Sequence, residues 1–444
     1  MPSDQTGAPM NTHASEPGLS LQSIADRVAG YDPTALRVDR AQAFIAQLVH
    51  PITGTEQLAL RSALGRVLAQ PVHSPIDVPS HDNSAMDGYA LRGSEIEPDG
   101  SSEWVVAGAG LAGHRFEGEV PAGHCVRITT GAVMPAGLDT VVPQEFTSVH
   151  EGRVRIAAGA VRAGDNRRLA GEDLARGGVA LPQGRLITPS DLGLAASLGR
   201  AELPVLRRLR VAFFSTGDEL RSVGEPLDAG CVYDSNRYTL WGMLSRLGFV
   251  ELLDMGVVRD EPAALKEAFS SSAAVADAII TSGGVSVGEA DHTKQVMAEL
   301  GDVCFWRIAM RPGRPMAIGR IHNGSPNGTI LFGLPGNPVA VMVTFYAFVR
   351  RALMQMAGIE GGELPMLRAR CMTPLRKKPG RTEYQRSIVS RAADGAWEVR
   401  ITGAQGSGIL SSMSTANGIV VLGHDQPDVA LGDEVEVWPF EGLI

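Results

Sequence analysis

The stretch Leu209–Leu220, LRVAFFSTGDEL, has the pattern of a buried strand that ends in a glycine turn. Two later stretches have the same pattern, Ala276–Gly284 (ADAIITSGG) and Thr329–Pro338 (TILFGLPGNP). Between them, residues 236–248 and 261–273 place apolar side chains at helical spacing. Strands that alternate with helices predict a parallel sheet with helices on both faces. We therefore expect a central α/β domain over residues 206–358.

The rest of the chain divides by its local composition. Residues 1–35 are rich in Pro, Gly, Ser and Thr, which predicts a disordered tail. Segments 36–71 and 171–205 have helical spacing and are expected to form one discontinuous helical linker domain. Residues 72–170 alternate short Val/Ile runs with Gly and Pro, which predicts an inserted β-rich domain, and residues 364–444 predict a small β-barrel. The expected fold class is a multidomain chain of α/β plus β type.

Charge and composition narrow the possible functions. The 444-residue chain has a formal net charge of -9, so a broad basic surface for nucleic acid is not expected. Its four cysteines form no CxxC pair, which is typical of the reducing cytoplasm rather than of a disulfide framework or zinc site. The most apolar stretch, Val339–Val349, is too short to span a bilayer. We expect a cytoplasmic protein that binds neither nucleic acid nor membrane.

The loops that follow the three strands are expected to form one binding site, because ligands of open α/β sheets bind outside the carboxyl ends of the strands. The residues that these loops would present are Ser215, Thr216, Gly217, Asp218, Glu219, Ser282, Gly283, Gly284, Ser286, Asp291, Pro335, Asn337 and Pro338. Purely structural roles remain open, since Asp291 and Asn337 could cap helices and Asp218 could serve only as a turn residue.

The loop Ile280–Asp291, ITSGGVSVGEAD, combines glycines with two carboxylates, Glu289 and Asp291. Glycine loops after strands usually bind phosphate through main-chain N–H groups, and carboxylates repel phosphate. A divalent cation between them resolves the conflict, because Mg²⁺ is typically held by one or two carboxylates together with phosphate oxygens. The loop therefore predicts a phosphate ester or pyrophosphate bound with magnesium. The alternative is that the carboxylates cap helices and never meet the ligand.

The segment Trp306–Pro315, WRIAMRPGRP, supplies Arg307, Arg311 and Arg314. Planar guanidinium groups suit oxyanions such as phosphate or molybdate, and the Pro-Gly turn favours a shaped anion loop over a solvated strand edge. Arg381 and Arg386 in the last domain are further candidates. By contrast, GAGLAG (108–113) matches GxGxxG but no helical pattern follows it, so no dinucleotide site is expected there.

Seven segments resemble, in order, the motifs of the molybdopterin molybdenumtransferase family, which includes the bacterial MoeA proteins and the E domain of gephyrin. The resemblance covers about residue 39 to the end of the chain. The segments are DNSAMDGYA (82–90), RITTGAVMPAG (127–137), FSTGDEL (214–220), YDSNRY (233–238), SGGVSVGEADHT (282–293), RPGRP (311–315) and GLPGNPVA (333–340).

This resemblance implies a function and an assembly. It implies insertion of molybdate into the dithiolene of adenylylated molybdopterin, with release of AMP and a requirement for Mg²⁺. It also implies an elongated homodimer, in which the β-rich domain is a lid and the cleft lies between the α/β domain of one subunit and the lid of the other. Molybdopterin adenylyltransferase would be a possible further partner.

The resemblance also implies roles for individual residues. It places Asp87 and Thr130 in the lid and Asp173 in the GEDL segment, although Asp87-Gly88 is also an ordinary hairpin turn signal. Asp87, Glu219, Asp260 and Asp291 would be catalytic, and the last three would be the metal ligands. The basic positions, often Lys in relatives, would be Arg307, Arg311 and Arg314.

Two other functions remain open at this stage. Adenylylation of molybdopterin is a sister activity on the same α/β fold, but the expected lid and barrel favour the transferase. A scaffolding role, as in gephyrin, is less favoured because no fused adenylylating domain is present in this sequence. The sequence does not decide between molybdate and tungstate.

Overall fold

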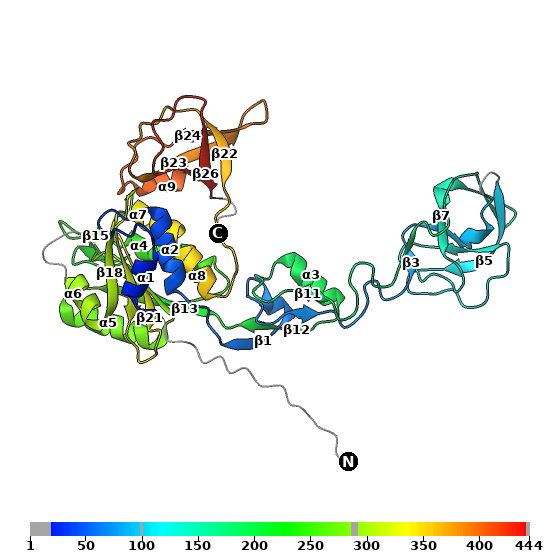
Figure 1. Cartoon of the computed structure of the whole chain (residues 1–444), viewed down its shortest axis with the longest axis horizontal. Helices are drawn as coiled ribbons and strands as arrows, with labels where there is room; N and C mark the ends of the chain where they lie inside the picture. Colours follow the sequence, from blue (N-terminus) through cyan, green and yellow to red (C-terminus); the bar gives the residue numbers. More distant parts are fainter. Residues whose placement is uncertain (1–18, 98–100, 286–291, 441–444) are drawn as a thin grey trace, which may run out of the picture.

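The computed structural model describes residues 19–97, 101–285 and 292–440 of the chain. Figure 1 shows a long molecule with an α/β body that carries a β-barrel, a narrow arm, and a second β-domain at the far end of the arm. The body and the far β-domain therefore lie at opposite ends of the chain's long axis.

The body is built on a six-stranded sheet whose strands are, in spatial order, β16 (Val250–Val258), β13 (Leu209–Thr216), β17 (Ala278–Ser282), β21 (Thr329–Leu334), β20 (Pro315–Ile321) and β18 (Gly301–Arg307). The first four strands are parallel, as the alternating pattern predicts. The last two run antiparallel to their neighbours, which corrects the prediction of a wholly parallel sheet. The reason is that a short loop, rather than a crossover helix, joins β18 to β20.

Helices cover both faces of this sheet, as predicted (Figure 1). Successive residues of a strand point to opposite faces, so Phe213 packs in the larger core and Phe214 in a second core, where its ring lies 5.2 Å from that of Phe269. The helices are α4 (Ser235–Ser245), α5 (Pro262–Val275), α6 (His292–Leu300), α7 (Pro338–Thr344), the π-helical turn η4 (Phe345–Val349) and α8 (Arg350–Met356).

One continuous helix, Pro338–Met356, runs through α7, η4 and α8. Its 19 residues have a mean hydropathy of 1.3, so by length and composition it could cross a membrane, and the argument from the length of Val339–Val349 does not hold. However, 78% of it is buried inside the protein, and Phe345 and Phe348 lie in the larger core. Its apolar character is explained by its position as a core helix.

The prediction of a disordered tail is wrong from residue 19 onward. Helix α1 (Leu21–Arg27) begins at Ser20, whose hydroxyl accepts a hydrogen bond from the Ser23 N–H. Leu21 and Ile24 are buried in the larger core, and Arg320 donates to the Leu19 carbonyl. The helical spacing of these apolar residues was obscured by the polar composition around them.

Helix α2 (Val38–Leu48) packs the N-terminal segment against β18. The Phe44 ring stacks on Tyr31 at 5.6 Å and meets the edge of Trp306 at 5.0 Å, and the Trp306 indole N–H donates to the Tyr31 hydroxyl at 2.9 Å. This aromatic cluster fastens residues 31–44 to the body.

The arm joins the two segments that flank the far β-domain, but its content differs from the helical prediction. Strand β1 (Thr55–Ala59) pairs with β12 (Glu202–Leu206), and β2 (Val72–His73) pairs with β11 (Val179–Leu181). A 3-10 turn, η1 (Leu60–Ala63), and helix α3 (Pro189–Ser197) pack on these strands. The apolar residues of 60–67 were interpreted as a helix. A short 3-10 turn followed by Val67, which forms an isolated β-bridge with Leu186, gives a similar spacing of apolar side chains.

The far β-domain is a six-stranded sheet in the order β7 (Thr140–Pro143), β4 (Gly88–Leu91), β6 (His124–Ile128), β5 (Ser102–Gly110), β9 (Arg153–Ile156) and β8 (Thr147–His150). The short pair β3 (Asn83–Ser84) and β10 (Arg167–Arg168) joins it to the arm. The GAGLAG segment begins inside β5 and continues into a bridged turn, so it does not lie in the strand–turn–helix context that a dinucleotide-binding motif requires.

The predicted C-terminal barrel is confirmed. Five strands close on themselves through the pairing of β23 with β25, and they are β23 (Thr382–Arg391), β24 (Trp397–Ile401), β22 (Leu367–Cys371), β26 (Glu434–Pro439) and β25 (Gly418–Leu422). The two-residue strand β19 (Met310–Arg311) pairs with β23, so the barrel is joined to the loop between β18 and β20. Helix α9 (Leu410–Thr415) packs beside α7.

Phe44→Ala should destabilise the body, because it removes the ring that links Tyr31 to Trp306. The expected loss is about 3–5 kcal/mol of unfolding free energy, measured by urea denaturation followed by tryptophan fluorescence. Phe146→Ala is the matched control, because Phe146 is exposed, and should change stability by about 0.5 kcal/mol or less. Equal shifts for the two variants would contradict the assigned packing.

Candidate active site

A cavity of about 1280 Å³ lies at the carboxyl ends of the parallel strands, where the body meets the barrel. All three loops predicted from the strand–turn pattern contribute to it. The first provides Thr216, Gly217 and Glu219, the second Gly283 and Gly284, and the third Pro335, Gly336, Asn337 and Pro338. The strand-edge prediction therefore brings these residues together.

Two carboxylates reach the cavity, one from the first loop and one from the loop after β16. A Cβ on Gly217 would lie 2.6 Å from an oxygen of Glu219, so the Glu219 carboxylate lies over the Gly217 main chain. Asp260, from the loop after β16, also lines the cavity, and its N–H donates to Asp218 at 3.1 Å. Asp218 thus acts as a turn residue that joins two loops, which is the structural role left open for it.

The second loop depends on Gly283. Its φ of +95° is strained for other residues, and a Cβ there would lie 2.4 Å from the Thr216 carbonyl oxygen. Its N–H donates to the Leu334 carbonyl at 3.1 Å. Gly283 therefore allows close approach of the first and second loops.

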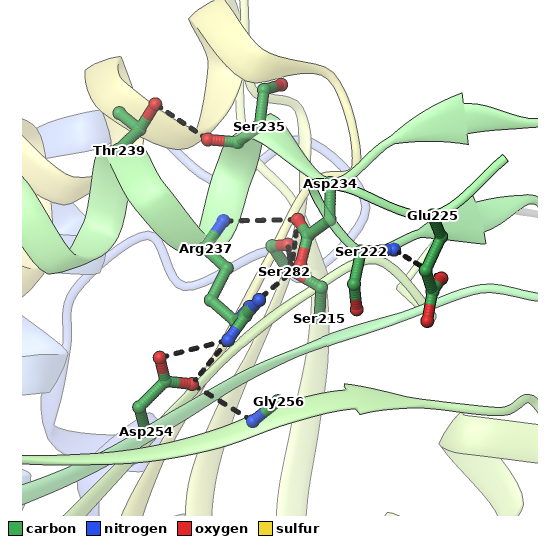
Figure 2. A network of polar contacts seen from close by, with 10 residues as sticks. All are labelled: Ser215, Ser222, Glu225, Asp234, Ser235, Arg237, Thr239, Asp254, Gly256 and Ser282. Atoms are coloured by element: carbon green, nitrogen blue, oxygen red, sulfur yellow. Dashed lines mark hydrogen bonds and ion pairs between the residues drawn. The ribbon is translucent and has the colours of Figure 1, made fainter. Parts of the chain in front are cut away.

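Ser215 and Ser282 do not line the cavity, although both were predicted to contact ligand. Both are buried beneath it, and their hydroxyl oxygens lie 3.0 Å apart (Figure 2). The next residue of the first loop, Thr216, does line the cavity. The Thr216 hydroxyl is buried and has no hydrogen-bond partner within the described residues, so it is available to a ligand.

Asn337 occupies the N-cap position of α7, but its side chain makes no capping hydrogen bond. Helix capping therefore does not account for it, and its amide lies on the cavity wall. The same wall holds the loop between β18 and β20.

That loop places Arg311 and Arg314 on the cavity wall. Arg307, predicted as a third member, is an exposed residue at the end of β18 and is absent from the cavity wall that the structure describes. Its main chain bonds to the N-terminal segment instead, accepting from the Leu36 N–H at 3.0 Å. Proximity in sequence grouped the three arginines, but the strand end separates Arg307 from the other two.

The barrel contributes a third cavity arginine, Arg381, which was predicted as a further candidate. Its guanidinium donates to the buried Glu383 carboxylate at 2.7 Å. Arg386, the other candidate, is fully buried and instead donates to the carbonyl oxygens of Ala404, Gln405 and Gly406. Burial and the nearby positive charge of Arg311 lower the pKa of Arg386.

Residues that the sequence reasoning missed come from the loop that Arg386 holds. Gln405, Gly406 and Ser407 line the cavity, and the Ser407 carbonyl accepts from the Val339 N–H at 3.1 Å. This loop belongs to the barrel and reaches the body only through tertiary packing. The TGAQGSG composition of 402–408 signals a turn but not its position.

The predicted residues Asp87 and Thr130 meet in the far β-domain. One oxygen of Asp87 accepts from the Thr130 N–H at 2.7 Å and from the Thr130 hydroxyl at 2.8 Å, and these bonds lower the pKa of Asp87. Asp173 is exposed in the arm, where its N–H donates to the Val78 carbonyl. None of the three lines the cavity of its own chain as described.

Three family models match the chain: the MoeA N-terminal region (domain I and II) over residues 36–199, the probable molybdopterin binding domain over 212–355, and the MoeA C-terminal region (domain IV) over 368–440. The chain is 41% identical over 411 residues to the molybdopterin molybdenumtransferase of Haemophilus influenzae, covering 92% of this chain and 100% of that protein. It belongs to the molybdopterin molybdenumtransferase family.

Two further comparisons agree. The chain is 36% identical to the molybdopterin molybdenumtransferase of Nostoc sp., covering 86% of this chain and 88% of that protein. The crystal structure of the molybdopterin biosynthesis MoeA protein from Pyrococcus horikoshii matches with a TM-score of 0.77 at 26% identity, covering 91% of this chain and 99% of that one. The resemblance stated from the motifs and the expected fold class are confirmed.

The structure of this member of the molybdopterin molybdenumtransferase family describes two of the three predicted metal ligands. Glu219 and Asp260 both line the cavity, while Asp291 and Ser286 lie outside the described residues. In the part of the chain that is described, no group of three His, Cys, Asp or Glu side chains is placed to hold a metal. The three-carboxylate set therefore stays a prediction.

Gly283→Ala should weaken binding of inorganic pyrophosphate, because the added Cβ would push the first and second loops apart. Gly224→Ala is a close control: Gly224 has φ +96°, and a Cβ there has nothing within 4 Å. Both variants should lose about 1 kcal/mol of stability from backbone strain, and Gly283→Ala should lose more because its Cβ would collide with the Thr216 carbonyl. Only Gly283→Ala should lower pyrophosphate affinity, by about tenfold or more in calorimetric titration. Equal affinities would contradict the role of this loop.

Proposed function

We propose that this chain is itself a molybdopterin molybdenumtransferase, which inserts molybdate into the dithiolene of adenylylated molybdopterin and releases AMP. The observation that carries this proposal is the mixed charge of the cavity. Three guanidinium groups and two carboxylates line a space that is also bordered by the glycine-containing loops after the strands. Such a site suits a substrate that carries a pyrophosphate together with a second oxyanion.

The arginines divide the anionic parts of the substrates between them. Arg311 and Arg314 lie on the loop between β18 and β20, and they would hold molybdate near the dithiolene sulfurs through paired N–H donors. Arg381 reaches the same cavity from the barrel and is held by Glu383. The Thr216 hydroxyl and the glycine loops would bind the pyrophosphate.

The two cavity carboxylates fit a magnesium site. Mg²⁺ usually takes one or two protein carboxylates and completes its shell with phosphate oxygens and water, so Glu219 and Asp260 suffice, with Asp291 as a further predicted ligand. When bound, the metal would offset negative charge on the pyrophosphate oxygens as AMP leaves. The carboxylates themselves can accept hydrogen bonds from a water molecule at the pyrophosphate and so orient it.

The lid residues point to a dimer. Asp87 directly precedes β4 and Thr130 follows β6, and the far β-domain built from these strands lies at the opposite end of the molecule from the body that holds the cavity (Figure 1). In a homodimer with a shared cleft, the lid of one subunit would reach the cavity of the other, where Asp87 would position substrate or water. The Thr130 bonds keep Asp87 ionised, which suits such a role. Asp173, near the lid, would bind substrate from the same side.

The surroundings of the reaction follow from its chemistry. The substrate must come from an adenylylating enzyme, so molybdopterin adenylyltransferase is the proposed upstream partner. We place the enzyme in the cytoplasm, a location that suits its four free cysteines.

A direct assay tests the activity. The protein, adenylylated molybdopterin, molybdate and Mg²⁺ should together yield AMP and mature cofactor in equal amounts. Arg314→Ala should raise the molybdate concentration needed for half-maximal rate by about tenfold or more. As the counter-test, the protein is supplied with ATP and unadenylylated molybdopterin. Consumption of that ATP, without AMP release in the first mixture, would assign the sister activity instead.

Subunit mixing tests the shared cleft. Asp87→Asn and Glu219→Gln should each lower the rate by about a hundredfold or more. After random exchange of subunits, half of the dimers are mixed and hold one cleft with both native residues, so about one quarter of wild-type activity should return. No recovery, with exchange verified by native mass spectrometry, would place both residues in a cleft of one chain.

A further inference from the structure

The motif YDSNRY (233–238) forms the start of α4, and the functions assigned above give it no role. Asp234 is the N-cap, and its carboxylate accepts from the Arg237 N–H at 3.2 Å. It is only 1% exposed. Burial of a carboxylate is costly unless the group is paired and hydrogen-bonded. The other contacts of the Asp234 carboxylate therefore show which parts of the protein it holds in place.

One of those contacts reaches the strand ends beneath the cavity. The Ser215 hydroxyl donates to Asp234 at 2.8 Å and lies 3.0 Å from the Ser282 hydroxyl (Figure 2). A hydroxyl has one hydrogen, and that of Ser215 is committed to Asp234, so Ser282 must donate to Ser215. A single carboxylate therefore joins the ends of β13 and β17, directly before the cavity residues Thr216 and Gly283.

The third loop is held from the same helical turn. The Asn236 amide donates to the Gly336 carbonyl at 2.7 Å, and Asn236 is 9% exposed. Gly336 lines the cavity between Pro335 and Asn337. The first turn of α4 thus bonds to Ser215 and to Gly336 and is linked to Ser282 through Ser215, while neither Asp234 nor Asn236 lies on the cavity wall.

The buried charge of Asp234 is balanced on its outer side. Arg237 donates to Asp234 at 3.3 Å and to both oxygens of Asp254, at 3.0 and 3.2 Å (Figure 2). Burial opposes the charge on Arg237, but the bonds to Asp254 and the charge of Asp234 outweigh it and raise the pKa of Arg237. The Gly256 N–H fixes Asp254 in turn at 3.0 Å. The network is thereby anchored to β16.

We propose that Asp234 and Asn236 are positioning residues that hold the three cavity loops in register. Their effect on catalysis rests on the proposed function, whereas their effect on the loops does not. An N-cap alone would need only the bond to the Arg237 N–H. The bonds to Ser215 and Gly336 add nothing to helix capping and act on the loops.

Asn236→Asp tests the third loop. The change replaces the donor to the Gly336 carbonyl with a carboxylate that repels it, while an acidic residue in the first turn favours α4. Hydrogen exchange measured by mass spectrometry should become faster in peptides covering 333–337 and stay unchanged in those covering 213–217. In the transferase assay, kcat should fall by about tenfold or more, because misplaced groups lose rate more than binding.

Asn323→Asp is the matched control. The Asn323 amide also donates to a main-chain carbonyl, that of Ala273, but near the amino end of β21, away from the cavity. It should leave both the 333–337 exchange and kcat near wild type. If Asn236→Asp and Asn323→Asp gave the same exchange in 333–337, the positioning role of Asn236 would be wrong.

Asp234→Ser tests the other two loops independently. Serine caps a helix about as well as aspartate, but it is one atom shorter and cannot hold Ser215 in the same way. Exchange should become faster in peptides covering 213–217 and 280–285, with 333–337 unchanged. Unchanged exchange in these two regions would overturn the role of Asp234. Because the exchange measurements need no substrate, faster exchange in a protein whose wild type lacks transferase activity would overturn only the proposed function.

Discussion

The site depends on the burial of four parallel strands between two layers of helices. Because β13, β17 and β21 run in one direction, the chain must turn after each of them at the same edge, and their loops meet there whatever their sequence separation. The strand residues below that edge are mostly apolar, whereas residues of the loops after it line the cavity. Near these strand ends, Ser215 and Ser282 bond to each other, and Ser215 bonds to Asp234, rather than lining the cavity. A shift of one residue separates a hydroxyl that is bonded within the protein from a cavity-lining residue whose buried hydroxyl has no partner within the described residues, as Ser215 and Thr216 illustrate.

The sequence predicts the elements with strong periodicity and fails where local signals are shared by different structures. Strand–glycine–helix patterns placed Glu219, Gly283 and Asn337 correctly on one cavity. The segment around Leu60 was misread as a helix, because a 3-10 turn and an extended residue give similar spacing of apolar side chains. Arg307 was grouped with Arg311 and Arg314 because they are close in sequence. Closeness in sequence does not show that Arg307 is still part of strand β18, whereas the other two belong to the loop that lines the cavity. The loop 405–407 could not be found at all, since its place on the cavity depends on how the barrel docks and on carbonyl contacts with buried Arg386.

The charge of the cavity opposes the charge of the whole chain. The protein has a net charge of -9, yet three arginines line the same cavity as two carboxylates: Arg311, Arg314 and Arg381 with Glu219 and Asp260. Arginine keeps its charge at any physiological pH, so even Arg386, whose pKa is lowered by burial and by Arg311, remains a cation that orders the barrel loop. Separate positive and negative groups in one space suit a ligand that is itself anionic but carries a divalent cation. A uniformly basic cavity would bind the anion and exclude the metal.

The barrel explains how such a cavity can be ready before substrate arrives. The loop that carries Arg311 is held on one side by β23 of the barrel and, a few residues earlier, by main-chain bonds from Leu36 to residues 307 and 309. The Ser407 carbonyl joins the barrel loop to the start of α7, and the first turn of α4 holds the remaining three loops from beneath. Donors fixed in advance need no reorganisation when charge develops, which is the main source of electrostatic stabilisation in enzymes. The lid, by contrast, is joined to the body only through the arm. In the proposed dimer, the cavity would already hold its binding groups, and the partner subunit would add closure of the cavity and Asp87.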